Sequence, residues 1–243
     1  MRLYVPTKVE ALQAARLTKG GASWSVPAGF ACAVTPALSA QHPDEDQEGL
    51  EWLAFCDAAH MSLGQLVADP SVTPLRVVVS VDVASVEVSL VTDVGSDAVA
   101  DAAHAETSTA EAWDDASASL VRVGQVIADA PVAAVHVDEA QAAADVTALS
   151  ALLDQLEALD HVGGDVAATH GSEVRSAVTA EAEAYGHTMN QPGEDQPGQL
   201  AGENKGEGAG DDALSEAVYR VAERDLLWFD ATEICDITPM AGA

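Results

Sequence analysis

The sequence predicts an α/β or α+β fold in which a single mixed sheet is flanked by helices and carries a long acidic insertion. Three observations favour this class. Short valine-rich runs, of which residues 75–83 are the most continuous, are typical of buried strands. Between them, apolar residues recur every three or four positions, as on the buried side of a helix. About half of the 243 residues (48%) are hydrophobic, which is enough for one substantial core.

The N-terminal third alternates strands with helices. Residues 2–5 have the pattern of a short strand, and Thr7 is a suitable cap for a helix that follows directly. Residues 29–35 predict a second strand, and residues 48–68 predict a long helix whose apolar stripe includes Trp52. The successive valines of residues 75–83 predict a strand that is buried on both faces.

The remaining strands and helices are shorter. Three further segments have strand character: residues 86–91, 120–128 and 132–138. Residues 92–118 lack periodicity and predict a surface excursion, whereas residues 213–223 predict a helix. The run Leu-Leu-Trp-Phe at 226–229 and the run at 2–5 are both expected to be central or near-central strands. Residues 226–229 are therefore expected to lie mainly in the core, with Arg224 as a surface charge.

The chain is expected to form one α/β domain from residues 1–140 and 212–243. Residues 141–189 are then a helical insertion, because leucines recur at helical spacing in its first part. Residues 190–211 combine proline, glycine and charge, with Leu200 and two alanines as their apolar content. That content cannot offset an ordering cost of about 1–2 kcal/mol per residue, so this linker is predicted to be disordered.

Composition restricts the classes of function. The formal net charge of −30 argues against direct binding to nucleic acid, which requires a cationic surface. No apolar run is long enough to span a bilayer, and the first residues lack an apolar targeting segment. Cys32, Cys56 and Cys235 form no CxxC pair, which favours a reducing compartment. We therefore expect a cytoplasmic protein that contacts neither membranes nor nucleic acid directly.

Three predicted strands end in aspartate, at Asp82, Asp138 and Asp230. Parallel strands would bring these carboxylates to one edge of the sheet, and His136 shares a strand face with Asp138. Together, these four side chains are candidate ligands for a divalent metal. The favoured interpretation is helix capping, because Asp138 precedes Gln141, and Asp230 precedes Glu233, by the three residues of a capping box.

Other candidate sites carry weaker signals. Cys56 and His60 have ligand spacing on a helix, but they share the side of its apolar residues and are interpreted as core. The motifs GxGxxG, Walker A, HExxH and GxSxG do not occur in the sequence. No catalytic residue is therefore assigned, and no cofactor is expected apart from the divalent metal of the alternative hypothesis.

Four segments carry a resemblance to a known family: MRLYVP at the start, RVVVSVDV, VAAVHVDE and the terminal DLLWFDATE. In this order they resemble a family of small cytoplasmic proteins from high-GC Gram-positive bacteria, described as a domain of unknown function. The resemblance covers residues 1–91, 119–140 and 212–236, and it implies no activity, cofactor or catalytic residue. Because family members are shorter, it also implies that residues 141–211 are an insertion particular to this chain.

Three hypotheses for the function follow. The favoured one is a non-catalytic cytoplasmic interaction or regulatory module, either a homo-oligomer or bound to an unidentified protein partner. The alternative is a small metal-dependent hydrolase or phosphoryl-transfer enzyme that uses Asp82, Asp138 and Asp230 around a divalent cation, with His136 as ligand or general base. A second alternative is an acidic mimic of nucleic acid, which rests on charge alone.

Overall fold

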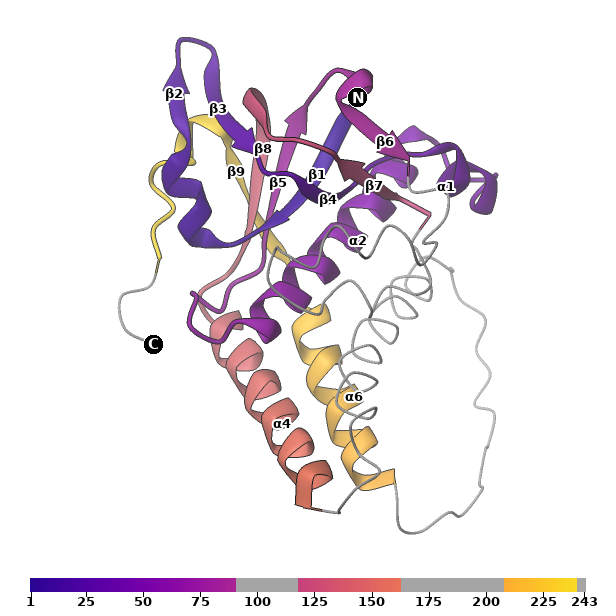
Figure 1. The fold of residues 1–243 in the computed structure, drawn as a ribbon, viewed down its shortest axis with the longest axis vertical. Coiled ribbons are helices and arrows are strands. Elements are labelled where there is room, and N and C mark those ends of the chain that lie inside the picture. Colours follow the sequence, from indigo (N-terminus) through magenta and orange to yellow (C-terminus); the bar gives the residue numbers. More distant parts are fainter. Residues whose placement is uncertain (91–117, 163–207, 240–243) are drawn as a thin grey trace.

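The computed structural model of the protein describes residues 1–90, 118–162 and 208–239 (Figure 1). Nearly all of the predicted surface excursion at 92–118 lies outside the described residues. So do residues 163–189 of the predicted helical insertion and residues 190–207 of the predicted disordered linker. The last residues of that linker are described, and they are helical, because the final helix begins at Gly208.

The described strands form one antiparallel sheet in the order β2-β3-β8-β5-β1-β4-β7-β6, with β9 also paired to β8. Their bounds are β1 (Arg2–Thr7), β2 (Arg16–Thr18), β3 (Gly21–Val26), β4 (Gly29–Cys32), β5 (Val77–Asp82), β6 (Val88–Leu90), β7 (Leu120–Val123), β8 (Ile127–Asp138) and β9 (Leu226–Asp230). The α+β class is confirmed. The sheet is antiparallel rather than mixed, because each strand meets its neighbours in opposite direction, even where a long helical connection separates them in sequence.

Helices lie beside and below this sheet in Figure 1. The α-helices are α1 (Pro36–Gln41), α2 (Gln47–Ala68), α4 (Ala142–Val162) and α6 (Gly208–Ala222), and short 3₁₀ helices are η1 (Val9–Ala14), η2 (Ser85–Glu87) and η4 (Ala231–Glu233). The predicted helix at 48–68 is confirmed, and the Asp46 side chain caps it by accepting a bond from the Gly49 backbone N–H. Thr7 caps no helix. It is the last residue of β1, and the segment after it is only a 3₁₀ helix.

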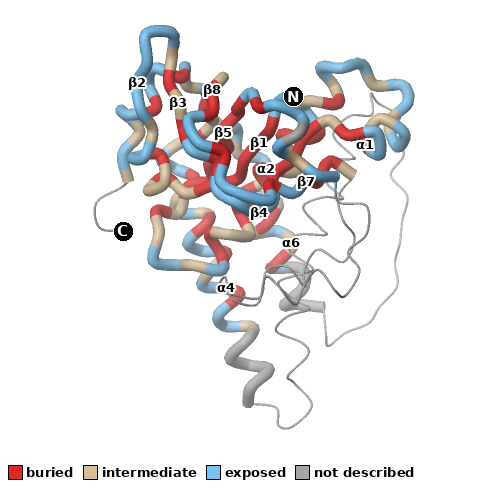
Figure 2. The backbone as a smooth tube through the Cα atoms, turned by 45° about the horizontal axis from the view of Figure 1, so that its top comes forward, coloured by how far each residue is buried: buried red, intermediate tan, exposed pale blue. Residues whose placement is uncertain are grey.

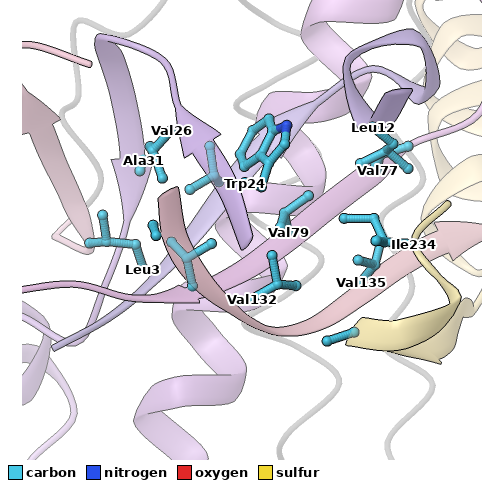
Figure 3. Close-up of a cluster of buried hydrophobic side chains, with 14 of the residues drawn as sticks. Leu3, Leu12, Trp24, Val26, Ala31, Val77, Val79, Val132, Val135 and Ile234 are labelled. Carbon is cyan, nitrogen blue, oxygen red and sulfur yellow. The ribbon is translucent and has the colours of Figure 1, made fainter. Parts of the chain in front are cut away.

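Three hydrophobic clusters stabilise the fold. Successive side chains of β5 point to opposite faces of the sheet, so Val77 and Val79 enter one cluster and Val78 enters another. Figure 3 shows the first cluster, in which valines of β5 and β8 meet Leu3, Trp24 and Ile234. The second cluster lies under α2, and the third joins the C-terminal part of α2 to α4 and α6.

The central strands are buried as predicted. Residues 77–81 are all buried, which confirms the two-sided burial expected for the valine run. Figure 2 shows buried residues concentrated along β8, β5, β1 and α2. The prediction of a central first strand is also confirmed, because β1 lies between β5 and β4.

The C-terminal strand differs from the prediction. Among the described strands, β9 pairs with β8 alone, so it is an edge strand rather than a central one. Leu227 is 48% exposed and Trp228 is 61% exposed, so neither side chain is in the core. Leu226 and Phe229 are partly buried, since they pack against the second and the first cluster respectively. Hydrophobic composition alone cannot distinguish an edge strand from a central one.

A buried ion pair joins the start of β5 to the end of β8 and to the residues just before β9. Asp138 accepts a bond from the Arg76 backbone N–H (2.8 Å), and it pairs with the guanidinium of the same residue (2.7 Å to Nη2). The Arg76 side chain is 2% exposed and that of Asp138 is fully buried. Arg76 Nη2 also donates to the Arg224 carbonyl (2.7 Å), and the Arg224 guanidinium pairs with Glu139 (2.8 Å) and Asp145 (2.9 Å). Arg224 is therefore a link between α4 and the start of β9, and more than a surface charge.

Removing one partner of this pair is expected to destabilise the fold strongly. Asp138→Asn keeps the shape of the side chain but leaves the Arg76 charge buried without a counter-charge, which costs about 3–5 kcal/mol. The matched control is Asp82→Asn, because Asp82 pairs with Arg2 at an exposed position, where ion pairs contribute less than about 1 kcal/mol. Urea denaturation followed by circular dichroism measures both. Equal losses of stability in the two variants would contradict the role assigned to Arg76.

Candidate functional site

A groove of about 780 Å³ opens between the N-terminal half of α2 and the sheet at β8 and β9. We call it the α2 groove. Its lining residues are Arg2 and Tyr4 of β1, Glu45, Glu48, Gly49, Glu51, Trp52 and Phe55 at the start of α2, Ser80 of β5, Ala133, Ala134 and His136 of β8, and Asp225, Leu226 and Trp228 at β9.

The register of the sheet explains why this groove is present. Tyr4, Ser80 and Ala134 are opposite one another on β1, β5 and β8, and His136 is opposite Trp228. Because these residues share one face, they form a continuous floor. Helix α2 packs mainly over β1, β4 and β5, its Phe55 reaches His136 of β8, and the groove lies beside this contact. The small side chain of Ala134 adds to the space.

Aromatic side chains line both walls of the groove. Trp52 on α2 is 57% exposed, and Trp228 on β9 is 61% exposed. Phe55 is buried beneath them. Its ring centroid is 5.4 Å from that of Trp52, 6.2 Å from that of Tyr4 and 4.7 Å from that of His136. Packing on Phe55 therefore holds Trp52, Tyr4 and His136 in place before any ligand arrives.

The charged side chains of the groove are mostly acidic. Its carboxylates are Glu45, Glu48, Glu51 and Asp225, and its guanidinium is that of Arg2. Arg2 Nε donates to Asp82 (3.2 Å), and this bond raises the Arg2 pKa. Because Arg2 is already paired, the groove offers net negative charge together with two exposed indole rings.

Tyr4 and His136 are neutral polar groups in the floor. Burial, together with the nearby Glu51 carboxylate, raises the pKa of Tyr4, so its hydroxyl stays protonated and donates to Glu51 (3.2 Å). Burial lowers the pKa of His136, and its buried Nδ1 has no hydrogen-bond partner. His136 is thus an uncharged imidazole at neutral pH.

The four metal candidates do not converge. Asp82 pairs with Arg2, and Asp138 is at the other end of the sheet with Arg76, because β5 and β8 run antiparallel. His136 does share the sheet face of Asp138, but the Asp138 carboxylate is occupied by Arg76. The described residues contain no group of three or more His, Cys, Asp or Glu side chains that could hold a metal ion. Convergence required parallel strands, and the sheet has none among its described pairs.

The capping interpretation is confirmed for Asp230 and wrong for Asp138. Asp230 accepts a bond from the Thr232 backbone N–H (2.9 Å), and Glu233 accepts one from the Asp230 backbone N–H (2.8 Å). The bond from Thr232 lowers the Asp230 pKa. The carboxylate of Asp138 binds Arg76 instead of the helix after it. Its partner is 62 residues away in sequence, so local spacing could not reveal it.

A family model for a family of unknown function, DUF6912, matches residues 1–173. The chain belongs to the DUF6912 family. No curated protein matches it, and no solved structure does. The match runs through α4 to residue 173, so the expectation that residues 141–211 are an insertion particular to this chain does not hold for residues 141–173. In this DUF6912 protein, the α2 wall and the β8 floor of the groove lie inside the matched range, whereas β9 lies outside it.

The groove could not be recognised in the sequence, because its aromatic residues have the pattern of core residues and its carboxylates have the pattern of a solvated surface. Trp52 was expected in the apolar stripe of its helix, yet it is mostly exposed. Its sequence neighbours Glu48 and Glu51 were an available signal, since carboxylates one and four positions before a tryptophan share or flank its side of a helix.

Among the described residues, no helix has both the length and the apolar character needed to cross a membrane.

Two partly buried histidines of the DUF6912 protein, His60 and His136, predict a loss of stability in acid. Burial lowers the pKa of His60 to about 4, outweighing the opposing effect of Asp57, and the pKa of His136 is lowered in the same direction. The folded state therefore binds protons less readily than the unfolded state, in which His titrates near pH ~6.5. The contribution of the neutral His60 imidazole to the free energy of unfolding is fully present above pH ~6.5. It decreases as the pH falls toward 4, by at most about 3 kcal/mol.

The measurement is the free energy of unfolding between pH 7 and pH 4 for the wild type and for His60→Gln. The variant lacks the titrating imidazole, so its stability should decline less over this range, and the difference between the two curves removes the contribution of the carboxylates. Identical pH dependence in both proteins would show that His60 is not buried in its neutral form.

Proposed function

We propose that this DUF6912 protein is a non-catalytic cytoplasmic interaction module that binds a lysine- or arginine-rich segment of a partner protein in the α2 groove. One observation carries the proposal. The exposed rings of Trp52 and Trp228 lie in a groove whose carboxylates outnumber its single guanidinium, which is already paired with Asp82.

The chemistry of the groove suits a cation with an apolar stem. An ammonium or guanidinium group is attracted to the face of an indole ring, by about 0.5–1 kcal/mol at exposed sites and about 2 kcal/mol when desolvated. Carboxylates such as Glu48 and Asp225 supply charge-assisted hydrogen bonds to the same group. The methylene stem of a lysine or arginine can pack on Phe55 and the tryptophans.

A cationic partner is favoured over a second copy of the chain. Two copies would each bring a net charge of −30, and the groove of each would present the same acidic lining. Like charges oppose such an interface, whereas a basic segment is attracted over long range and at a rate that depends on salt. The metal-dependent alternative loses its support, because its aspartates are paired with arginines or cap a helix.

Binding can be tested with a fluorescently labelled lysine-rich peptide and measured by anisotropy at two salt concentrations. Trp52→Ala and Trp228→Ala should each weaken binding about 3- to 30-fold, which corresponds to the loss of one cation–π contact. The wild-type affinity should fall as salt rises, because the contacts are partly exposed.

A charge-matched pair of double variants separates the groove from the overall charge. Glu48→Gln with Asp225→Asn removes two carboxylates from the groove. Asp129→Asn with Glu216→Gln removes two exposed carboxylates elsewhere, on β8 and α6. The first pair should weaken binding and the second should leave it nearly unchanged. If the two double variants bound the peptide equally, the attraction would be nonspecific and the proposal would fail.

A further inference from the structure

We propose that the cationic segment binds as an extended strand that adds antiparallel to the free edge of β9. This inference rests on the proposed function and specifies the conformation and the sequence pattern of the partner. Among the described strands, β9 pairs with β8 and with no other, so its second edge is unpaired by them. Edge strands present unpaired backbone groups, and extended peptides bind to them by completing the sheet.

The backbone of Trp228 faces this free edge. The Asp138 backbone N–H donates to Arg76, on the β5 side of β8. Because backbone groups alternate sides along a strand, Val137 and Val135 face β9 and bond to Leu227 and Phe229, which are opposite them. Trp228, between those two residues, therefore directs its N–H and C=O away from β8. The C-terminal end of β9 has the same orientation, since the Asp230 N–H also points away from β8 and donates to the Glu233 side chain.

The side chains of β9 define what such a segment should contain. The Trp228 side chain lines the α2 groove, and Leu227, on the opposite face of the strand, is 48% exposed. A residue directly opposite Trp228 shares its face, so a lysine there lies beside the indole ring and the acidic groove. The next residue along faces the Leu227 side, where an apolar side chain is favoured. The structure thus points to alternating basic and apolar residues.

Charge at the ends of β9 selects against other strands. Asp225 precedes the strand and Asp230 ends it, and both are exposed. An identical edge from a second copy would bring like charges together, which is how many proteins protect an edge strand from self-pairing. The same acidic residues attract a strand that carries lysine or arginine.

The test uses capped peptides in which lysine and valine alternate, with N-methyl groups on either the lysines or the valines. In antiparallel addition, the residue opposite Trp228 directs its own N–H toward β9, and this residue is a lysine. N-methylation of the lysines should therefore weaken binding about tenfold or more, because it removes the hydrogen bonds to β9. N-methylation of the valines should change it less than about twofold, because their N–H groups face solvent.

The two peptides have equal charge and equal methyl content, so their difference reports the direction of the backbone. If both bound as tightly as the unmethylated peptide, strand addition would be overturned and groove binding would stand. Greater weakening by valine methylation would overturn the antiparallel arrangement. Failure of the unmethylated peptide to bind at all would instead overturn the proposed function.

Discussion

The buried ion pair between Arg76 and Asp138 fixes the relative positions of β5, β8 and β9. It joins the beginning of β5 to the end of β8, and the same guanidinium holds the Arg224 carbonyl just before β9. Arg224 in turn binds Glu139 and Asp145, so α4 is tied to the same point. A buried arginine requires its full set of acceptors, and this requirement fixes where β9 begins. The second wall of the α2 groove is therefore positioned by a network outside it.

The two faces of the sheet have different roles because of their side chains. One face of β5 presents valines to a closed core, whereas the other presents Val78 and Ser80 toward α2 and the groove. Helix α2 packs mainly on the part of this face formed by β1, β4 and β5. Ala134 and His136 form the floor of the groove, and Phe55 packs against His136 and Trp52. The groove thus results from a helix that covers only part of one sheet face.

Much of the fold could be predicted from the sequence, because it depends on local patterns. The valine run at β5, the apolar spacing of α2 and the capping pair of Asp230 and Glu233 all depend on neighbouring residues, and each is confirmed. Strand order and direction depend on distant residues. The edge position of β9, the pairing of Asp138 with Arg76 and the separation of Asp82 from Asp138 could not be read from spacing. The groove could not be predicted for the same reason, since its lining residues lie as far apart in sequence as Arg2 and Trp228.

The indole N–H signals of the tryptophans in a ¹⁵N NMR spectrum report whether a basic peptide binds between Trp52 and Trp228. Trp24 is buried and donates its indole N–H to the Ala11 carbonyl (3.0 Å), so it serves as an internal control. On addition of a basic peptide, the signals of Trp52 and Trp228 should shift together along one binding curve while that of Trp24 stays in place. Unchanged signals for Trp52 and Trp228 at peptide concentrations that saturate binding would show that the peptide does not bind in the α2 groove.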